Sequence, residues 1–542
     1  MSRHRLIRLL IVALPLSGFV ALSGCLALSS GEPATGAAPR IDPREQNAWF
    51  AAGRRDVARA RALASGAAHA PDAAHAPDAA QAPDSATARN VILFVGDGMG
   101  LSTVTAARIL EGQLRGEMGE ARLLAFEALP YVALSKTYTT DMQVPDSAGT
   151  MTAMVSGVKT LSGVLGVDET VRRGDASSVP DATVATLLEE AERRGLSTGV
   201  VTTARVTHAT PAACFAHAAL RSWEDDAELP EAARLAGFPD IARQLVEFDV
   251  GDGLEVAMGG GRRHFLPNDV PDPENAAETG HRRDGRDLTR EWVEGREGAA
   301  YVWRQDQLSA LDLASTRHLL ALFEPSHMRF EADRDADPGG EPSLAEMTAV
   351  AIELLERNPE GFFLMVEGGR IDHGHHANNA YRALTDTIAF SDAVRTARDA
   401  TGDDTLIVVT ADHSHTLSIS GYPMRGNPIL GKVVAPDWRG GGEPTPTLDA
   451  KGRPYTTLSY ANGPSALDDL RPTDLREIDT TAPDYRQSAT LPLRSETHAG
   501  EDVPVYAGGP GAALFHGVRE QSYLYHAMVE ALGWTRNGVP VD

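Results

Sequence analysis

Residues 90–100 read NVILFVGDGMG, an apolar run that ends in a glycine-flanked aspartate. A short run that is apolar at every position is typical of a strand buried on both faces, as in parallel sheets. Glycines on both sides of Asp97 would let the backbone approach a bound ion closely. Gly-Asp-Gly alone is a weak signal, because many turns contain it. The stretch therefore predicts a buried strand at residues 91–95 with a polar side chain just beyond its carboxyl end.

The same pattern recurs further along the chain. Strands are predicted at 198–202, 362–366 and 406–410, each followed by polar residues, and helices at 182–194, 344–357 and 380–400. Alternating strands and helices predict an α/β fold, a three-layer sandwich with a large, mostly parallel central sheet flanked by helices. Because ligands bind beyond the carboxyl ends of strands in such sheets, we expect the functional site there.

The composition narrows the classes of partner. The chain has 542 residues, of which 42% are hydrophobic, and a formal net charge of -25. Nucleic-acid binding relies on lysines and arginines that meet phosphates, so this charge argues against a nucleic-acid partner. An acidic protein can still hold a locally positive site where metal ions supply the charge.

The first 25 residues have the character of a targeting segment. Basic residues at 3, 5 and 8 precede an apolar run at 9–22, which is too short for a membrane-spanning helix. Residues 22–25, LSGC, resemble a bacterial lipobox, in which Cys25 would be acylated; the alternative is an ordinary signal peptide with a chance cysteine. We expect an exported protein, lipid-anchored to the bacterial cell envelope and facing the periplasm or the surface. Leu26 in place of an aspartate favours the outer membrane.

The remaining chain divides by composition. Residues 26–89 hold a Gly/Ala/Ser/Pro-rich tether, a predicted helix at 41–63 with Asp42 as its N-cap, and an Ala-Pro-Asp repeat. The main domain is predicted at 90–542, with a smaller, loop-rich, crown-like insertion at 420–495. The one other cysteine, Cys214, lies in an apolar stretch and is expected to be a buried hydrophobic side chain.

Two histidine-rich clusters suggest metal binding. Residues 372–376 read DHGHH and residues 412–415 read DHSH, and each follows a predicted strand. Asp372 and His376 are four apart, so on a helix both face one side and could hold one ion, while His375 faces away. A polar helix face is the alternative for one such cluster, but two after strands argue against it. Mixed imidazole and carboxylate ligands suit zinc, and the oxygens of Asp97, Glu367 and a hydroxyl would suit magnesium.

A candidate nucleophile lies in residues 144–150, VPDSAGT, just before a predicted helix. Asp146 and Ser147 could simply cap that helix, which is the commoner role of such a pair. A helix N-terminus also offers amide donors and a positive dipole to a phosphate. A zinc-bound serine there would lose its proton near neutral pH and attack phosphorus.

Six segments in order resemble the alkaline phosphatase family. They are residues 96–100 (GDGMG), 146–148 (DSA), 207–211 (THATP), 367–376 (EGGRIDHGHH), 410–415 (TADHSH) and 496–502 (ETHAGED). The resemblance runs from about residue 90 to residue 526. It is closer to the animal-type enzymes than to the enterobacterial ones, because His208 and His373 stand where the latter have Asp and Lys.

The resemblance implies a two-zinc, one-magnesium centre. One zinc would be held by Asp372, His376 and His498. The second would be held by Asp97, Asp412 and His413, with Ser147 as the nucleophile. Magnesium would take Asp97, Thr210 and Glu367, with His208 nearby through water. The phosphate clamp would be Arg221, and the supporting residues would be Asp146, His208, His373 and His415, the last orienting Asp372.

Animal-type members also carry a calcium site. It matches Glu274, the backbone of Phe323, Glu324 and Glu341 in this chain, although Glu341 stands where an aspartate is expected. An acidic surface cluster without a metal is the alternative.

The implied activity is hydrolysis of a broad range of phosphate monoesters through a phosphoserine, releasing inorganic phosphate. The family also implies a homodimer, with contacts from the 41–63 helix and the insertion. A sulfatase would need x-Pro-x-Arg after its nucleophile, whereas Ala-Gly-Thr follows Ser147, and diesterases usually present threonine. A surface lipoprotein that binds phosphate or metal without catalysis is a further alternative. Such a relative would be expected to lack Ser147 or Arg221.

Overall fold

Residues 90–96 form a central strand of the main sheet. In the computed structural model, strand β1 (Asn90–Gly96) is buried at every position. It lies between β7 (Phe362–Gly368) and β8 (Thr405–Ala411) and runs parallel to both. The strands predicted at 91–95, 362–366 and 406–410 are confirmed. The fourth predicted strand is also present as β3 (Ser197–Arg205), beside β7.

The described residues are 43–64, 87–437, 445–467 and 474–534, and all of them belong to one compact unit, Asp42–Gly538. The lipobox with Cys25, the tether, Asp42 and the Ala-Pro-Asp repeat therefore lie outside the described residues. Among the described helices, none is both long enough and apolar enough to span a membrane.

Ten strands make up the main sheet. Their order is β15 (Gly517–Glu520), β2 (Tyr131–Lys136), β14 (Val503–Gly508), β8, β1, β7, β3, β4 (Val256–Gly260), β6 (His318–Leu322) and β5 (Ala299–Val302). Strand β14 is antiparallel to both of its neighbours, and the other pairings are parallel. The predicted mostly parallel sheet is confirmed.

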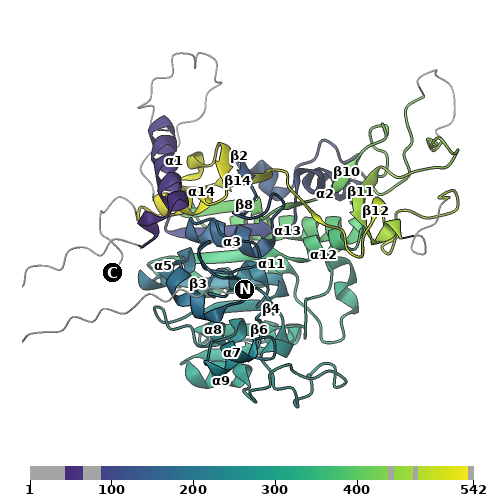
Figure 1. The fold of residues 1–542 in the computed structure, drawn as a ribbon. Coiled ribbons are helices and arrows are strands. Elements are labelled where there is room, and N and C mark those ends of the chain that lie inside the picture. Colours follow the sequence, from purple (N-terminus) through teal and green to yellow (C-terminus); the bar gives the residue numbers. More distant parts are fainter. Residues whose placement is uncertain (1–42, 65–86, 438–444, 468–473, 535–542) are drawn as a thin grey trace, which may run out of the picture. The chain divides into compact units, whose positions relative to one another are not determined.

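Helices cover both faces of this sheet (Figure 1). Because side chains alternate along a strand, Val91 and Leu93 join one core while Ile92 and Phe94 join the other. The first core includes residues of α1 (Ala48–Ala64), α3 (Ser147–Ser156), α5 (Leu187–Arg193) and α14 (Tyr523–Ala531). The second includes residues of α2 (Leu101–Leu114), α11 (Leu344–Leu355) and α13 (Ala380–Ala400). These three layers match the predicted α/β sandwich.

Shorter helices lie in the connections. They are α4 (Val179–Ala182), α6 (Ala209–Ala212), α7 (Glu231–Leu235), α8 (Ile241–Val246), α9 (Leu288–Gly295), α10 (Gln305–Ser309) and α12 (Arg370–His376). Helix α12 follows β7 directly and carries the DHGHH cluster.

Two predicted helices begin later than the sequence pattern indicated. The first is a 3-10 turn at Pro43–Gln46 followed by α1, where the Asn47 side chain accepts bonds from the amides of Trp49 and Phe50. The second begins at Leu187 instead of residue 182. Thr186 and Glu189 form a reciprocal capping box at that point, which fixes the helix start. Local caps decided both boundaries.

Two small sheets lie apart from the main one. Strands β10 (Leu417–Ile419), β11 (Leu458–Gly463) and β12 (Ser488–Pro492) form a three-stranded sheet. Strands β9 (Ser414–His415) and β13 (His498–Ala499) pair in antiparallel register, with His415 opposite His498. This short pairing brings His498 back to the residues that follow β8.

Candidate active site

The site lies at the carboxyl ends of three adjacent strands. Asp97 follows β1, Glu367 is the penultimate residue of β7, and Asp412 and His413 follow β8. The registers pair Val95 with Glu367 and Gly96 with Ala411. The site residues at the ends of the three strands therefore lie at the same edge of the sheet. Parallel pairing thus gathers residues that are hundreds of positions apart.

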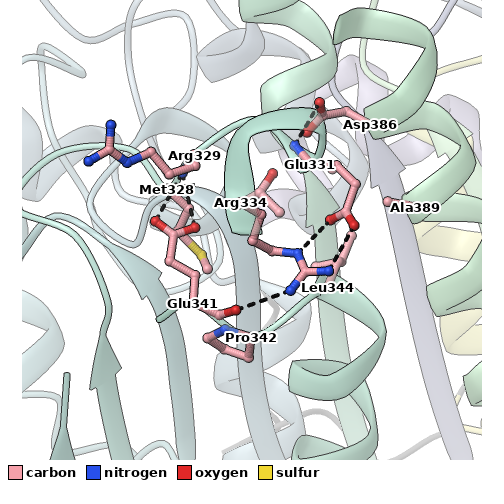
Figure 2. Close-up of a pocket in the computed structure, with 11 residues that line it drawn as sticks. Met328, Arg329, Glu331, Arg334, Glu341, Pro342, Leu344, Asp386 and Ala389 are labelled. Carbon is pink, nitrogen blue, oxygen red and sulfur yellow. Dashed lines mark hydrogen bonds and ion pairs between the residues drawn. The ribbon is translucent and has the colours of Figure 1, made fainter. Parts of the chain in front are cut away.

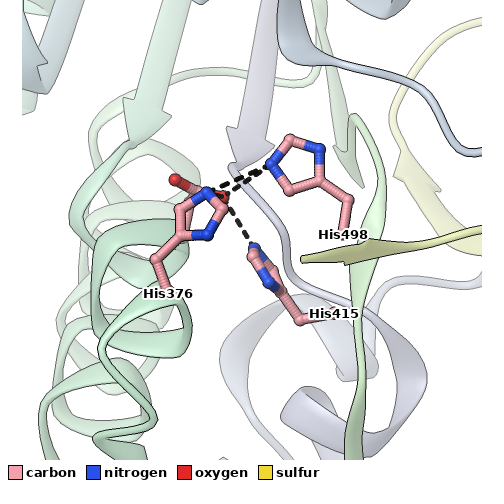
Figure 3. A group of neighbouring side chains, drawn as sticks. His376, His415 and His498 are labelled. Carbon is pink, nitrogen blue, oxygen red and sulfur yellow. Dashed lines mark hydrogen bonds and ion pairs between the residues drawn. The ribbon is translucent and has the colours of Figure 1, made fainter. Parts of the chain in front are cut away.

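The first group joins Asp372, His376, His415 and His498 (Figure 3). The Nε2 atoms of His376 and His498 lie 3.2 Å apart, and each lies within 3.4 Å of Asp372 Oδ1. Each ring directs its other nitrogen, Nδ1, at a backbone carbonyl: His376 at Glu496 (2.5 Å) and His498 at Pro145 (2.8 Å). A carbonyl oxygen only accepts, so each Nδ1 donates, and the two Nε2 atoms face each other and Asp372 Oδ1.

With Nδ1 as the donor, each neutral ring presents an Nε2 lone pair, and two such lone pairs 3.2 Å apart repel unless a cation lies between them. Two zinc–nitrogen bonds of about 2.05 Å at a tetrahedral angle would place the nitrogens roughly 3.3 Å apart. A metal-ligating histidine also typically donates its other N–H to a carbonyl or carboxylate. The group therefore has the geometry of a zinc site.

The second group is Asp97, Asp412 and His413. His413 Nε2 lies 3.4 Å from Asp97 Oδ1, 3.3 Å from Asp412 Oδ2 and 3.3 Å from Ser147 Oγ. Neither oxygen of Asp97 has a hydrogen-bond partner among the described residues, nor does Asp412 Oδ2. The other oxygen, Asp412 Oδ1, accepts bonds from the amides of Gly98 and His413, which fixes the carboxylate. Unpaired buried oxygens converging with an imidazole suit a metal ion.

Ser147 is the first residue of α3 and is almost fully buried. Asp146 caps this helix, because one of its carboxylate oxygens accepts bonds from the amides of Gly149 and Gly163. The capping interpretation of the pair is therefore correct for Asp146. Because Asp146 forms the cap, the Ser147 hydroxyl is free to face the second group. It lies at the N-terminus of α3, where the helix dipole favours negative charge.

The third group is Asp97, His208 and Glu367, with the Thr210 hydroxyl facing Glu367. His208 Nδ1 is buried without a hydrogen-bond partner among the described residues. Burial and the charges of Asp412, Asp372 and Glu367 raise the pKa of Asp97 well above its usual range. Burial and nearby carboxylates likewise raise the pKa of Glu367 to about 7. This crowding of buried carboxylates calls for a cation, and the oxygen-rich donor set suits magnesium.

The guanidinium of Arg221 faces the same space. It donates to Asp146 Oδ2 (3.0 Å) and contacts His208 Nε2 (3.0 Å), so a carboxylate and an imidazole fix its plane. The His373 ring lies 5.7 Å from that of His208. The structure thus brings Arg221, Asp146, His208 and His373 to the site where the resemblance placed them.

His415 contacts Asp372 Oδ1 at 2.7 Å through Nε2 and Glu496 Oε2 at 2.5 Å through Nδ1. Sequence reasoning had not assigned Glu496 a role, although its place two residues before His498 was a usable signal. His375 faces away from the site, as predicted, with both nitrogens bonded, to Thr103 and to Tyr460. Cys214 is buried, also as predicted.

His327 and Arg205 were also missed. The His327 ring lies 4.1 Å from His373 and 5.3 Å from His208, and Arg205 contacts its Nε2. Nothing in the local sequence around residue 327 indicated this position.

The calcium candidates also lie together, with one addition. The acidic cluster consists of Glu274, Glu324, Asp337 and Glu341, of which Asp337 was not predicted. Gly339 N donates to Glu274 (3.0 Å), and Arg329 Nε lies 2.8 Å from Glu324 and 3.5 Å from Asp337. Figure 2 shows the backbone amide of Arg329 donating to the Glu341 carboxylate. Phe323 directly follows β6 and precedes Glu324. Burial and repulsion from Glu274 and Asp337 raise the pKa of Glu324 to about 7.

Comparison with known proteins agrees with this geometry. Residues 88–534 match the family model for alkaline phosphatase. The chain is 47% identical to the tissue-nonspecific alkaline phosphatase of Gallus gallus over 452 residues, covering 82% of this chain and 84% of that one. It is 45% identical to an alkaline phosphatase of Gadus morhua over 451 residues, covering 82% and 91%.

Solved structures share the fold. The alkaline phosphatase of the Antarctic bacterium TAB5 superposes with a TM-score of 0.55 at 23% identity, covering 83% of this chain and 99% of that one. That of Thermus thermophilus superposes with a TM-score of 0.59 at 24% identity, covering 83% and 92%. The chain belongs to the alkaline phosphatase family and is a metal-dependent enzyme that hydrolyses phosphate monoesters.

Proposed function

We propose that this enzyme works with two zinc ions and one magnesium ion. The first zinc would be held by Asp372, His376 and His498, and the second by Asp97, Asp412 and His413. Magnesium would be held by Asp97, Thr210 and Glu367. The observation that carries the proposal is the 3.2 Å approach of the Nε2 atoms of His376 and His498, whose Nδ1 atoms both face backbone carbonyls. A variant of the TAB5 enzyme is described with magnesium bound in its M3 site, which fits an oxygen-rich third site.

Ser147 would be the nucleophile. Its Oγ attacks the phosphorus of the monoester and loses its proton, the bond to the alcohol oxygen breaks, and the alcohol leaves protonated. Water then attacks the phosphoserine from the opposite side and gives up a proton, the bond to Oγ breaks, Oγ takes up a proton, and inorganic phosphate is released. When bound, zinc ions lower the pKa of the hydroxyl and neutralise charge on the attacking and leaving oxygens.

Arg221 would hold the phosphate during both displacements. Its planar guanidinium can donate two parallel bonds to phosphate oxygens, and Asp146 and His208 already fix its orientation. The N-terminus of α3 adds a favourable dipole at the same point. These contacts engage the phosphoryl group and leave the alcohol unspecified, which supports a broad range of monoesters.

Metal dependence and substrate class can be tested together. We expect purified enzyme to contain zinc and magnesium near two and one per chain, and to hydrolyse 4-nitrophenyl phosphate much faster than bis(4-nitrophenyl) phosphate. Chelation should abolish turnover, and zinc with magnesium should restore it. Faster hydrolysis of the diester, or full activity in protein stripped of metal, would contradict the proposal.

Calcium is proposed for the acidic cluster. Two buried carboxylates, Glu324 and Glu341, and two partly buried ones, Glu274 and Asp337, offer hard oxygens that support it. Equilibrium dialysis with calcium should give one bound ion per chain beyond the catalytic ions. No bound calcium at millimolar concentration would refute this assignment.

Export, lipid anchoring and dimerisation complete the proposal. The basic and apolar segments before the LSGC motif support acylation at Cys25 and attachment to the bacterial envelope, facing the periplasm or the surface. Labelling with a fatty-acid probe should mark the wild type but not Cys25→Ser; equal labelling would contradict it. Family resemblance supports a homodimer, and a monomer in sedimentation at micromolar concentration would overturn it.

A further inference from the structure

A second histidine-carboxylate group lies outside the proposed catalytic centre. Asp225, His264 and His281 bring one ligand atom each to within 4.8 Å of one another. Asp225 lies in the loop between α6 and α7, His264 ends the 3-10 turn Arg262–His264 after β4, and His281 precedes α9. Three separate connections therefore meet at this group.

The side chains are oriented for a shared ligand. Asp225 Oδ1 accepts a bond from Ala227 N (2.9 Å), which leaves Oδ2 facing both rings. His264 Nδ1 lies 2.6 Å from Oδ2 and His281 Nδ1 lies 3.6 Å from it. The His281 backbone is fixed by its amide, which donates to Arg263 O (2.8 Å). Asp225 and His264 are fully buried, whereas the His281 side chain is 41% exposed and gives solvent access to the group.

His264 has a partner for either ring tautomer. In the present arrangement Nδ1–H can donate to Asp225, and Nε2 can accept from Arg263 Nε at 3.2 Å. If Nδ1 instead gives its lone pair to an ion, Nε2–H can donate to Glu224 Oε2, which lies 3.3 Å away. A carboxylate behind a ligating histidine is a recurring support of zinc sites.

The supporting carboxylate is itself held firmly. Arg205 forms a two-pronged pair with Glu224, and the Thr207 hydroxyl donates to Glu224 Oε2 at 2.6 Å. Such contacts resemble the outer contacts of a metal site more than those of an isolated histidine–aspartate pair.

We propose that Asp225, His264 and His281 bind a zinc ion, with water completing the tetrahedron on the exposed side. Two imidazoles and one carboxylate form a donor set that zinc prefers, and the ligand atoms need to move only slightly to surround it. The ion would tie together the three connections. One of them carries Arg221, four residues before Asp225, so the site would stabilise the loop that presents the phosphate clamp.

The test compares bound zinc in variants of the whole enzyme. After equilibration in a zinc buffer, His281→Ala should hold one zinc per chain fewer than the wild type. His281→Asp should keep the ion, because an aspartate oxygen can take the place of Nδ1. A control variant, His516→Ala, changes a histidine outside the group and should match the wild type. Since all variants share the catalytic centre, the difference does not depend on how many ions that centre holds.

Equal zinc in the wild type and His281→Ala would overturn the proposal. A second measurement uses only wild-type enzyme: acylation of His281 by diethyl pyrocarbonate, mapped by mass spectrometry, should fall at least several-fold when zinc is added. Unchanged acylation in excess zinc would also overturn it.

Discussion

The catalytic centre and the acidic cluster both gather buried carboxylates, but they balance the charge differently. At the centre, Asp97 has no hydrogen-bond donor among the described residues, and the imidazole of His413 lies beside it, with Nε2 3.4 Å from Oδ1. At the acidic cluster, the guanidinium of Arg329 lies beside Glu324 and Asp337, and Arg262 pairs with Glu274 at 3.0 Å. The chain neutralises the cluster in part by itself, whereas the centre depends on ions from solution.

Because of this difference, we expect substitutions at the centre to have larger effects than substitutions at the acidic cluster. Changes at the centre should remove catalysis or zinc, because among the described residues no arginine or lysine pairs with Asp97 or Asp412. Changes at the cluster should alter stability modestly, because an ion there competes with an arginine already present.

The largest effect should come from Ser147→Ala. Removing the hydroxyl abolishes the nucleophile but no carboxylate or imidazole, so we expect kcat to fall by at least about a thousandfold. Zinc and magnesium content should stay near that of the wild type. The measurement is steady-state hydrolysis of 4-nitrophenyl phosphate beside metal analysis. Turnover close to that of the wild type would exclude Ser147 as the nucleophile.

Many residues of this centre could be predicted from the sequence. Asp97, Glu367, Asp412 and His413 follow or end strands that an apolar pattern identifies, and parallel pairing brings strand ends together. The four-residue spacing of Asp372 and His376 placed both on one side of α12. Regular structure made these positions predictable from local pattern.

Contacts between irregular segments could not be predicted in that way. The bond from His415 to Glu496 joins residues 81 positions apart, through the two-residue strands β9 and β13. Asp337 enters the acidic cluster on a loop that contains Gly339 and Gly340, whose path no periodicity specifies. Arg221 was found only through family resemblance, because a lone arginine carries no pattern.

The next effect concerns His415, which contacts the proposed zinc ligand Asp372 and is assigned here as its support, not as a ligand. Glu496 and Asp372 overcome the effect of burial and raise the pKa of His415 to about 10, so the ring stays charged and holds Asp372. We expect His415→Asn to lower zinc affinity by about 10- to 100-fold. Competition with a zinc chelator measures this, and His516→Asn is the control. Unchanged affinity would mean that Asp372 needs no such support.

The smallest effect should appear at the acidic cluster as a dependence of stability on pH. Burial, together with repulsion from Glu324 and Asp337, raises the pKa of Glu341 from 4.5 to about 9. The folded protein therefore binds a proton that the unfolded chain has lost between these values, and stability falls as pH rises from about 5 to 9. Calcium, which binds the ionised carboxylates, should oppose this fall.

Glu341→Gln isolates that contribution, because the amide resembles the protonated acid. With catalytic ions saturating and no calcium, Tm of the wild type should fall more steeply between pH 5 and 9 than Tm of the variant. Added calcium should reduce the dependence of Tm on pH in the wild type. It should have a smaller effect on that dependence in Glu341→Gln. Glu353→Gln, on the exposed side of α11, is the control and should follow the wild type. If both glutamine variants gave the wild-type profile with and without calcium, Glu341 would carry no charge-dependent role, and Arg329 alone would balance the cluster.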